Sequence, residues 1–166
     1  MLEASEILWK SGFISMALTL EFGSQMTQTI IPPSPSLTIF SPSDHTFALS
    51  GQPSLSLLQF HFSPQYFPLQ TLKSLPSGTH IPTFFSNHPL IVTTSPSTYK
   101  ISINGVKINE TPIYDNGSLL IFGIDKFLDP SFRFVPEPGI GCVMLVNLEV
   151  LMLFLLLSSF WFNVIQ

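Results

Sequence analysis

Four histidines are the side chains of this chain best suited to acid–base or metal chemistry near neutral pH. They are His45, His61, His80 and His88, and none stands at a zinc-ligand spacing from another histidine or from a cysteine. We therefore predict no metal site. His61 is the one binding candidate, because it follows a predicted helix and lies beside Pro64. Its alternative role is that of a hydrogen-bonded, half-buried packing residue.

Nucleophilic catalysis would require an activated serine or cysteine beside a base that a carboxylate orients. Serines are abundant, but the chain contains neither a Gly-x-Ser-x-Gly turn nor a glycine-rich phosphate loop. Asp44 and Asp125 have structural explanations. Ser43 or Asp44 can accept the free N–H groups that begin a helix, and Asp125 can bond N–H groups in the turn after a strand. The sequence therefore predicts a protein that is not an enzyme and needs no cofactor.

Two motifs could receive a glycan: Asn109-Glu-Thr111 and Asn116-Gly-Ser118. Both lie at predicted strand ends or turns, where a glycan could project into water. Asn116 also has a purely structural explanation, because tight turns favour Asn before Gly. Asn109 and Asn116 are thus glycosylation candidates, and they matter only if the chain enters the secretory pathway.

The charge pattern argues against a nucleic-acid partner. Only 10% of residues are charged, against roughly 25% in a typical soluble domain, and the net charge is −4. The six basic residues are scattered and form no stripe for a phosphate backbone; they are Lys10, Lys73, Lys100, Lys107, Lys126 and Arg133. The 45% of apolar residues suffices for a core without disulfides, since Cys142 is the one cysteine. A surface rich in Ser, Thr, Asn and Pro is typical of many secreted or wall-associated proteins.

The secondary-structure elements that would position these residues differ between the two halves of the chain. The patterns predict helices over 4–10, 13–21 and 54–60, with Ser11-Gly12 ending the first. A short strand is predicted at 36–40, followed by the capped helix start at Ser43. In the second half, Asn104-Gly105 stands between alternating apolar residues and predicts a tight hairpin. Further strands are expected at 90–94 and 118–124. Helices before strands indicate an α+β fold.

The C-terminal tail has a different composition. Residues 143–165 carry one charge, Glu149, and are otherwise mainly apolar. About 20 mainly apolar residues can cross a bilayer as a helix. We predict a hydrophobic C-terminal helix that associates with a membrane through residues 143–165. Two forms of anchor stay open: a transmembrane helix, and a glycolipid (GPI) anchor signal with Gly139 and Gly141 as its small residues. The structural alternative is a buried core helix.

Four segments, taken in order, resemble the fasciclin (FAS1) domain, particularly that of plant fasciclin-like arabinogalactan proteins. Residues 37–47 (LTIFSPSDHTF) are similar to the first box of the family, and residues 57–64 (LLQFHFSP) to its Tyr-His region. Residues 103–106 (INGV) resemble the hairpin before the second box, and residues 119–130 (LLIFGIDKFLDP) the second box itself. The resemblance covers about residues 1–133.

This resemblance implies a wedge of two packed β-sheets with helices along an edge, and a non-catalytic role in adhesion and wall organisation. Two positions depart from the family pattern. Phe122 stands where the second box usually has His, and Phe60-His61 replaces the Tyr-His pair. Plant members usually begin with a signal peptide, whereas residues 1–20 include Glu3, Glu6 and Lys10 and do not read as one.

We therefore predict a FAS1-like domain at residues 1–134, and a linker with a hydrophobic tail at residues 135–166. The expected function is that of a cell-surface or cell-wall adhesion or structural domain. Its expected partners are a cell-wall polysaccharide or other cell-surface proteins, besides the membrane. The expected location is the membrane, the cell surface or the extracellular space of a plant cell. The alternative is a truncated or tail-anchored intracellular copy without an adhesion role.

Overall fold

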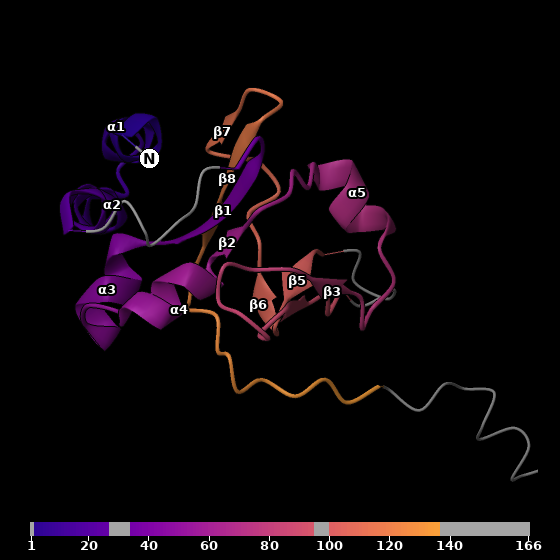
Figure 1. Cartoon of the computed structure of the whole chain (residues 1–166). Coiled ribbons are helices and arrows are strands. Elements are labelled where there is room, and N and C mark those ends of the chain that lie inside the picture. Colours follow the sequence, from indigo (N-terminus) through magenta and orange to yellow (C-terminus); the bar gives the residue numbers. More distant parts are fainter. Residues whose placement is uncertain (1, 27–33, 95–99, 137–166) are drawn as a thin grey trace, which may run out of the picture. The chain divides into compact units, whose positions relative to one another are not determined.

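A mixed four-stranded sheet forms the centre of the fold. The computed structural model describes residues 2–26, 34–94 and 100–136, and of residues 24–26 it describes the backbone alone. Strands β1 (Leu37–Pro42) and β8 (Leu119–Ile124) run parallel in the middle, as Figure 1 shows. Strand β2 (Phe62–Ser63) pairs antiparallel with β1, and β7 (Tyr114–Asp115) pairs antiparallel with β8, which gives the order β2-β1-β8-β7. The two central strands have near-continuous apolar sequences because both of their faces are covered.

Alternation along β1 and β8 divides the apolar interior into two cores, since successive strand residues point to opposite faces. Ile39 and Ile121 face one side, and Phe40 and Phe122 the other. The helix-side core consists of Ala4, Leu8, Met16, Ala17, Leu20, Ile39, Phe47, Leu58, Phe62 and Ile121. The hairpin-side core consists of Phe40, Phe60, Leu72, Ile81, Leu90, Val92, Ile101, Ile103, Val106, Ile108, Leu120, Phe122, Ile124 and Leu128.

Five helices are present among the described residues. They are α1 (Leu2–Lys10), α2 (Ile14–Met26), α3 (Asp44–Ser50), α4 (Leu55–Phe60) and α5 (Leu69–Ser74). The helices predicted at 4–10, 13–21 and 54–60 are confirmed, although α2 runs further, to Met26. The stop at Gly12 is also confirmed, because its φ is +84°, a left-handed conformation that glycine adopts without strain. Helix α5 was not predicted and lies between Pro68 and Pro76.

The remaining strands are very short. They are β3 (His80–Ile81), β4 (Leu90–Ile91), β5 (Ser102–Ile103) and β6 (Val106–Lys107), which form two two-stranded sheets. A single bridge, Val92 to Ile103, links the two pairs, and Ile108 bridges to Ile124 of β8. The α+β class is confirmed. In place of the two packed sheets that we expected, the described residues show one sheet of four strands and two of two strands. Proline explains the short β3–β4 ladder, since Pro82 and Pro89 lack the N–H that extending it would need.

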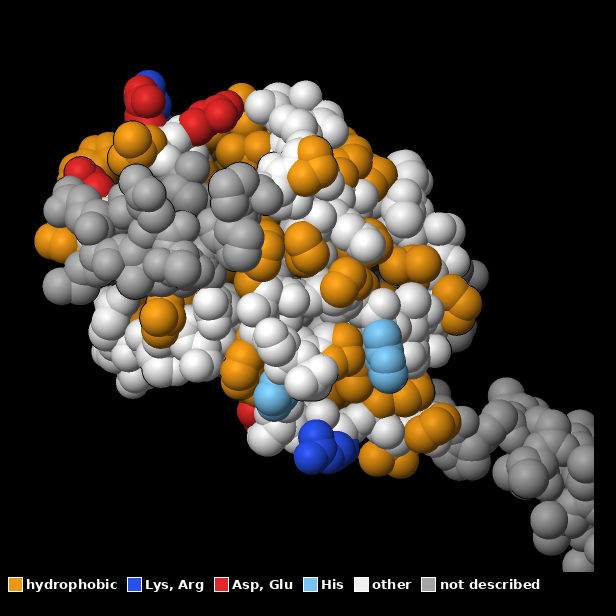
Figure 2. Space-filling view, viewed as in Figure 1, with side chains coloured by type: hydrophobic (Ala, Val, Ile, Leu, Met, Phe, Trp, Pro, Cys, Tyr) orange, Lys and Arg blue, Asp and Glu red, His pale blue; other side chains and the backbone are white. Residues whose placement is uncertain are grey.

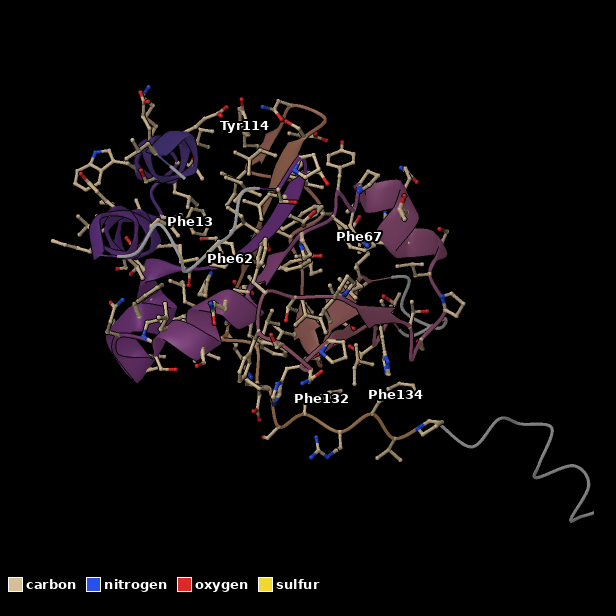
Figure 3. All side chains as sticks on the ribbon, viewed as in Figure 1. Phe13, Phe62, Phe67, Tyr114, Phe132 and Phe134 are labelled. Carbon is tan, nitrogen blue, oxygen red and sulfur yellow. The ribbon has the colours of Figure 1, made fainter. Side chains whose placement is uncertain are left out.

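An extended segment after Pro130 packs against the turns of the short strands. Phe132 and Phe134 extend from it in Figure 3. A Cβ on Gly105 would lie 3.4 Å from the Phe132 ring, and a Cβ on Gly78 would lie 3.1 Å from the Phe134 ring. Both glycines have positive φ, which favours glycine at each position, and at Gly78 a Cβ would also crowd the Phe134 ring.

The chain divides into two units, residues 1–134 and residues 135–166. Most of the second unit, including the predicted membrane segment 143–165 and Cys142, lies outside the described residues. Within the part that is described, no helix combines the length and the apolar character needed to cross a bilayer. The membrane-associated tail therefore stays a prediction.

Candidate functional site

His61, the predicted binding candidate, is almost completely buried, with 1% of its surface exposed. Its Nδ1 lies 2.7 Å from the Leu57 carbonyl oxygen, and the Leu128 N–H donates to its Nε2 at 3.0 Å. This pair of partners assigns the ring proton to Nδ1 in a neutral imidazole. Burial lowers the pKa of His61 to about 4. The ring therefore stays uncharged at neutral pH.

The surroundings of His61 give it a structural role. Its ring meets Phe60 and Phe127 edge to face, at centroid distances of 6.5 and 5.6 Å. It joins the end of α4 to the segment after β8, which are distant in sequence. We expected a half-buried ring, and the structure buries it almost fully, in contact with the rings of Phe60 and Phe127. Both ring nitrogens are used in this conformation, so a ligand has no ring atom to bind.

Asp44 caps a helix, but not the one that follows it. Ser43 is the N-cap of α3 and accepts from the Thr46 N–H. The Asp44 carboxylate accepts from the N–H groups of Ile14 and Ser15, at 3.2 and 2.8 Å, at the start of α2. A carboxylate at a helix N-terminus satisfies free donors and interacts favourably with the helix dipole. Asp44 thus links two helices, which gives it a structural role.

The turn after β8 differs from the prediction. Asp125 is exposed, and among the described residues its carboxylate bonds no backbone N–H. Asp129 has that role instead, accepting from the Ser131 N–H at 2.8 Å and from the Ser131 hydroxyl at 2.7 Å. Those two bonds hold the pKa of Asp129 below its usual value. Both positions are Asp in a loop, so composition alone could not choose between them.

The other histidines lie apart from His61. His45 and His80 are exposed, and His88 stacks on Phe85 with ring centroids 4.0 Å apart. The His88 Nδ1 is 2.8 Å from the Ser86 carbonyl oxygen. In the part of the chain that the structure describes, no three His, Cys, Asp or Glu side chains could jointly hold a metal ion.

Both glycosylation candidates are exposed, but their side chains are held differently. The Asn116 side chain lies in the turn between β7 and β8, where its Oδ1 accepts three hydrogen bonds from Ser118 and Leu119. Asn109 continues the β6 chain, and its N–H donates to the Gly123 carbonyl at 3.0 Å. Its Nδ2 lies 2.9 Å from the point where a Cβ on Gly123 would stand. Only Asn116 is therefore held by contacts confined to its own turn.

An open groove of about 860 Å³ runs between α2 and the α3–α4 region. Its lining is mostly apolar and contains no basic side chain; it consists of Ser15, Leu18, Thr19, Phe22, Gly23, Asp44, Phe47, Ala48, Gly51, Gln52, Pro53 and Leu55. Phe22 is 65% exposed. The face shown in Figure 2 has many apolar side chains and few charged ones.

Sequence reasoning missed this groove, although a signal was available. Ile14, Leu18 and Phe22 recur every four residues along α2 and are all exposed, while Met16, Ala17 and Leu20 are buried. A helix that is apolar on all sides is normally buried all round. Since α2 lies at the surface of the described domain, its outer residues leave an apolar surface in water.

The fold and these contacts define a small α+β domain in which the polar side chains of His61 and Asp44 serve the structure. The model of the fasciclin domain matches residues 12–130. The chain belongs to the fasciclin domain family.

Several known proteins are similar to it. Fasciclin-like arabinogalactan protein 20 of Arabidopsis thaliana is 42% identical over 75% of this chain and 29% of its own length. Fasciclin-like arabinogalactan protein 12 of the same plant is 29% identical, over 81% of this chain and 61% of its own length. A solved FAS1 domain pair from the insect cell adhesion molecule fasciclin I aligns at 16% identity, with a TM-score of 0.45, over 78% of this chain and 45% of that chain. The chain thus spans less than two thirds of the length of these relatives.

Proposed function

We propose that this chain is a non-catalytic adhesion or structural domain of the fasciclin-like arabinogalactan type, located at the plant cell surface or in the wall. The observation that carries this proposal is the fasciclin domain match over residues 12–130. The similar plant proteins support the arabinogalactan type.

The chemistry of the described residues supports a non-catalytic role. General acid–base catalysis needs a titratable group within reach of a substrate. His61 is buried with both ring nitrogens bonded, and the Asp44 carboxylate is bonded to the start of α2. These groups stabilise the fold, so the exposed surface is left for binding.

The groove beside α2 is the surface that we assign to partner contact. Exposed apolar surfaces on soluble domains commonly mark interaction sites. Phe22, Leu18 and Leu55 surround this one, with Gln52 and Ser15 as polar neighbours. The partner that we propose is a cell-wall polysaccharide or another cell-surface protein. The absence of basic side chains from the groove lining disfavours acidic partners.

Wall binding tests the proposed contact. Purified protein with Phe22→Ser should sediment less with isolated wall fragments than the unchanged protein does. Leu49→Ser is the matched control, because Leu49 is 74% exposed on α3 but does not line the groove. Equal loss in both variants, or loss in neither, would count against a contact at the groove.

The tail is the proposed membrane anchor, either as a transmembrane helix or as a GPI signal. Expression of the chain with and without residues 139–166 tests it by cell fractionation. We expect deletion to move the protein from the membrane fraction to the soluble fraction. Protease treatment of intact microsomes shows on which side of the membrane the domain lies. If the domain is digested there, it faces the cytosol, and the alternative of a tail-anchored intracellular copy replaces the adhesion role.

A further inference from the structure

We propose that Asn116, and not Asn109, is the site at which this domain carries an N-linked glycan. The inference rests on the proposed function in one respect, because the chain must reach the secretory lumen to be modified. The choice of Asn116 over Asn109 rests on the contacts of the two asparagines. They share the same short motif but occupy different structural settings, the turn between β7 and β8 and the end of a strand ladder.

The Asn116 turn is built from contacts between near neighbours in the sequence. The Asn116 Oδ1 accepts from the N–H of Leu119 at 2.7 Å and from the N–H and hydroxyl of Ser118 at 3.0 Å each. The Gly117 N–H donates to the Asp115 carboxylate at 3.0 Å, and Gly117 takes a φ of +85°. The bonds of the Asn116 Oδ1 join only neighbouring residues, so this part of the turn can form before the rest of the domain folds. In the folded domain the Tyr66 hydroxyl also donates to the Asp115 carboxylate, at 2.9 Å.

The amide nitrogen of Asn116 keeps a free position for a sugar. Its Nδ2 donates one hydrogen bond, at 3.3 Å, to the Tyr114 hydroxyl, which in turn donates to Glu3 at 3.1 Å. Figure 3 shows Tyr114 beside β7 near α1. A primary amide has two N–H hydrogens. Replacing the second one with a glycan leaves the bond to Tyr114 and all three bonds to Oδ1 in place, and Asn116 is exposed.

The donor of the glycan is an oligosaccharide linked to a polyprenyl diphosphate. The Asn116 nitrogen forms a bond to the anomeric carbon, while the bond from that carbon to the diphosphate oxygen breaks. The nitrogen gives up one proton to a base of the transferase, and the diphosphate leaves with the bonding electrons. The Ser118 hydroxyl, the third residue of the motif, donates to the Asn116 amide oxygen in this turn at 3.0 Å.

Asn109 occupies a position that a glycan fits poorly. Its N–H bonds the Gly123 carbonyl of β8, so the residue belongs to a contact that is long-range in sequence. Its Nδ2 and the Phe13 ring both come to within 3.0 Å of the point above Gly123 where a Cβ would be. The Asn109 amide and the Phe13 ring therefore approach the same point beside β8, which limits the room for a sugar on the inner side of that nitrogen.

The test uses the full chain, fused to a cleavable secretion leader and translated with microsomes, followed by N-glycosidase. The leader carries a reporter glycosylation motif that shows delivery to the lumen. The variants are Asn116→Gln, Ser118→Ala and Asn109→Gln. Ser118→Ala keeps the asparagine, so it separates loss of the motif from loss of the acceptor nitrogen.

We expect a mobility shift of one glycan that is lost in Asn116→Gln and in Ser118→Ala and is kept in Asn109→Gln. A shift that persists in Asn116→Gln, or a glycosylated reporter without any glycan on the domain, would overturn the inference. The same chain without the leader tests the proposed function separately. A shift that needs the leader would count against delivery of this chain to the lumen and would leave the assignment of Asn116 intact.

Discussion

On one face of the main sheet, α1, α2 and α3 cover Ile39 and Ile121, whereas on the other face the short hairpins and α5 cover Phe40 and Phe122. The two cores share the same strands but are held in place differently. On the hairpin side, the turns are specified by their own residues, as at Asn104-Gly105, where the φ values are +49° and +73°. The helix side depends on contacts between residues that are far apart in the chain.

Two such contacts place the helices on the sheet. Asp44 bonds the N–H groups of Ile14 and Ser15, which lie about 30 residues earlier in the chain. Gly123 lacks a side chain where the Phe13 ring approaches β8. The comparison teaches that a helix can be predicted from its own residues, while its position over the sheet depends on residues elsewhere. The predictions below test this difference between the two sides.

Removing an aromatic ring from the hairpin side should have the largest effect. Phe122 is fully buried and stacks on Phe40, with ring centroids 6.1 Å apart and an interplanar angle of 13°. We expect Phe122→Ala to lower the free energy of unfolding by about 4 kcal/mol, through lost burial and the cavity left behind. Ile121→Ala, the adjacent residue facing the helix side, should cost about 3 kcal/mol. Urea unfolding of both variants measures the difference, and a larger loss for Ile121→Ala would reverse the ranking.

Acid should destabilise the domain through His61. The pKa of His61 is lowered to about 4 in the folded state, from a usual value of 6.5. Between these values the unfolded chain binds a proton that the folded one does not, so stability falls as pH falls through this window. The full effect is about 3 kcal/mol, of which about 2 kcal/mol is lost by pH 5. Protonation would also remove the acceptor of the Leu128 N–H.

Denaturant unfolding between pH 6.5 and pH 5 measures this effect before most carboxylates titrate. The matched variant is His61→Gln, which keeps a polar side chain without a group that titrates here. We expect the variant to be less stable at pH 7 and its stability to change little over this range. Equal pH slopes in the variant and in the unchanged protein would show that another group causes the acid effect.

Filling the space above Gly123 should disturb the helix side. A Cβ there would lie 2.9 Å from the Asn109 Nδ2 and 3.0 Å from the Phe13 ring. Both distances are too short for ordinary carbon contacts, so the Asn109 amide and the Phe13 ring both have to give way. We expect Gly123→Ala to cost about 2 kcal/mol, in the range typical of overpacking. Thermal unfolding measures the cost, and the double variant Gly123→Ala with Phe13→Leu should recover part of it if the ring is the obstacle.

The confirmed predictions came from signals that need only near neighbours. Ser43, one of the two predicted caps, does cap α3 through the N–H group three residues later. The helix predicted at 54–60 is also present, with Ser54 as its N-cap rather than its first residue. The Asn104-Gly105 hairpin also formed as predicted, with β5 and β6 on either side. In each case, the residue and its partner lie within one turn of the chain, so a short stretch of sequence contains the whole interaction.

What could not be predicted depends on the assembled fold. The depth at which His61 is buried follows from Phe127 and Leu128, which reach it only once β8 lies beside β1. The groove beside α2 requires α3 and α4 to be in position. Asp44 was predicted as a helix cap, but the predicted helix was the wrong one, because both Ser43 and Asp44 suit the start of α3. A distant helix start has no signature in the sequence around Asp44.

The smallest effects are expected for the two helix caps, Asp44 and Ser43. They test most directly the difference between a distant and a local contact. Asp44→Ala removes two hydrogen bonds and a favourable charge from the start of α2, and should cost about 1 kcal/mol. Ser43→Ala removes the local cap of α3, whose bond to the Thr46 N–H is long at 3.4 Å, and should cost about 0.5 kcal/mol. Amide hydrogen exchange distinguishes the two variants by location. Asp44→Ala should raise exchange in the first turn of α2, and Ser43→Ala in α3. If Asp44→Ala raised exchange only in α3, Asp44 would be a local cap after all, and the position of α2 would need another explanation.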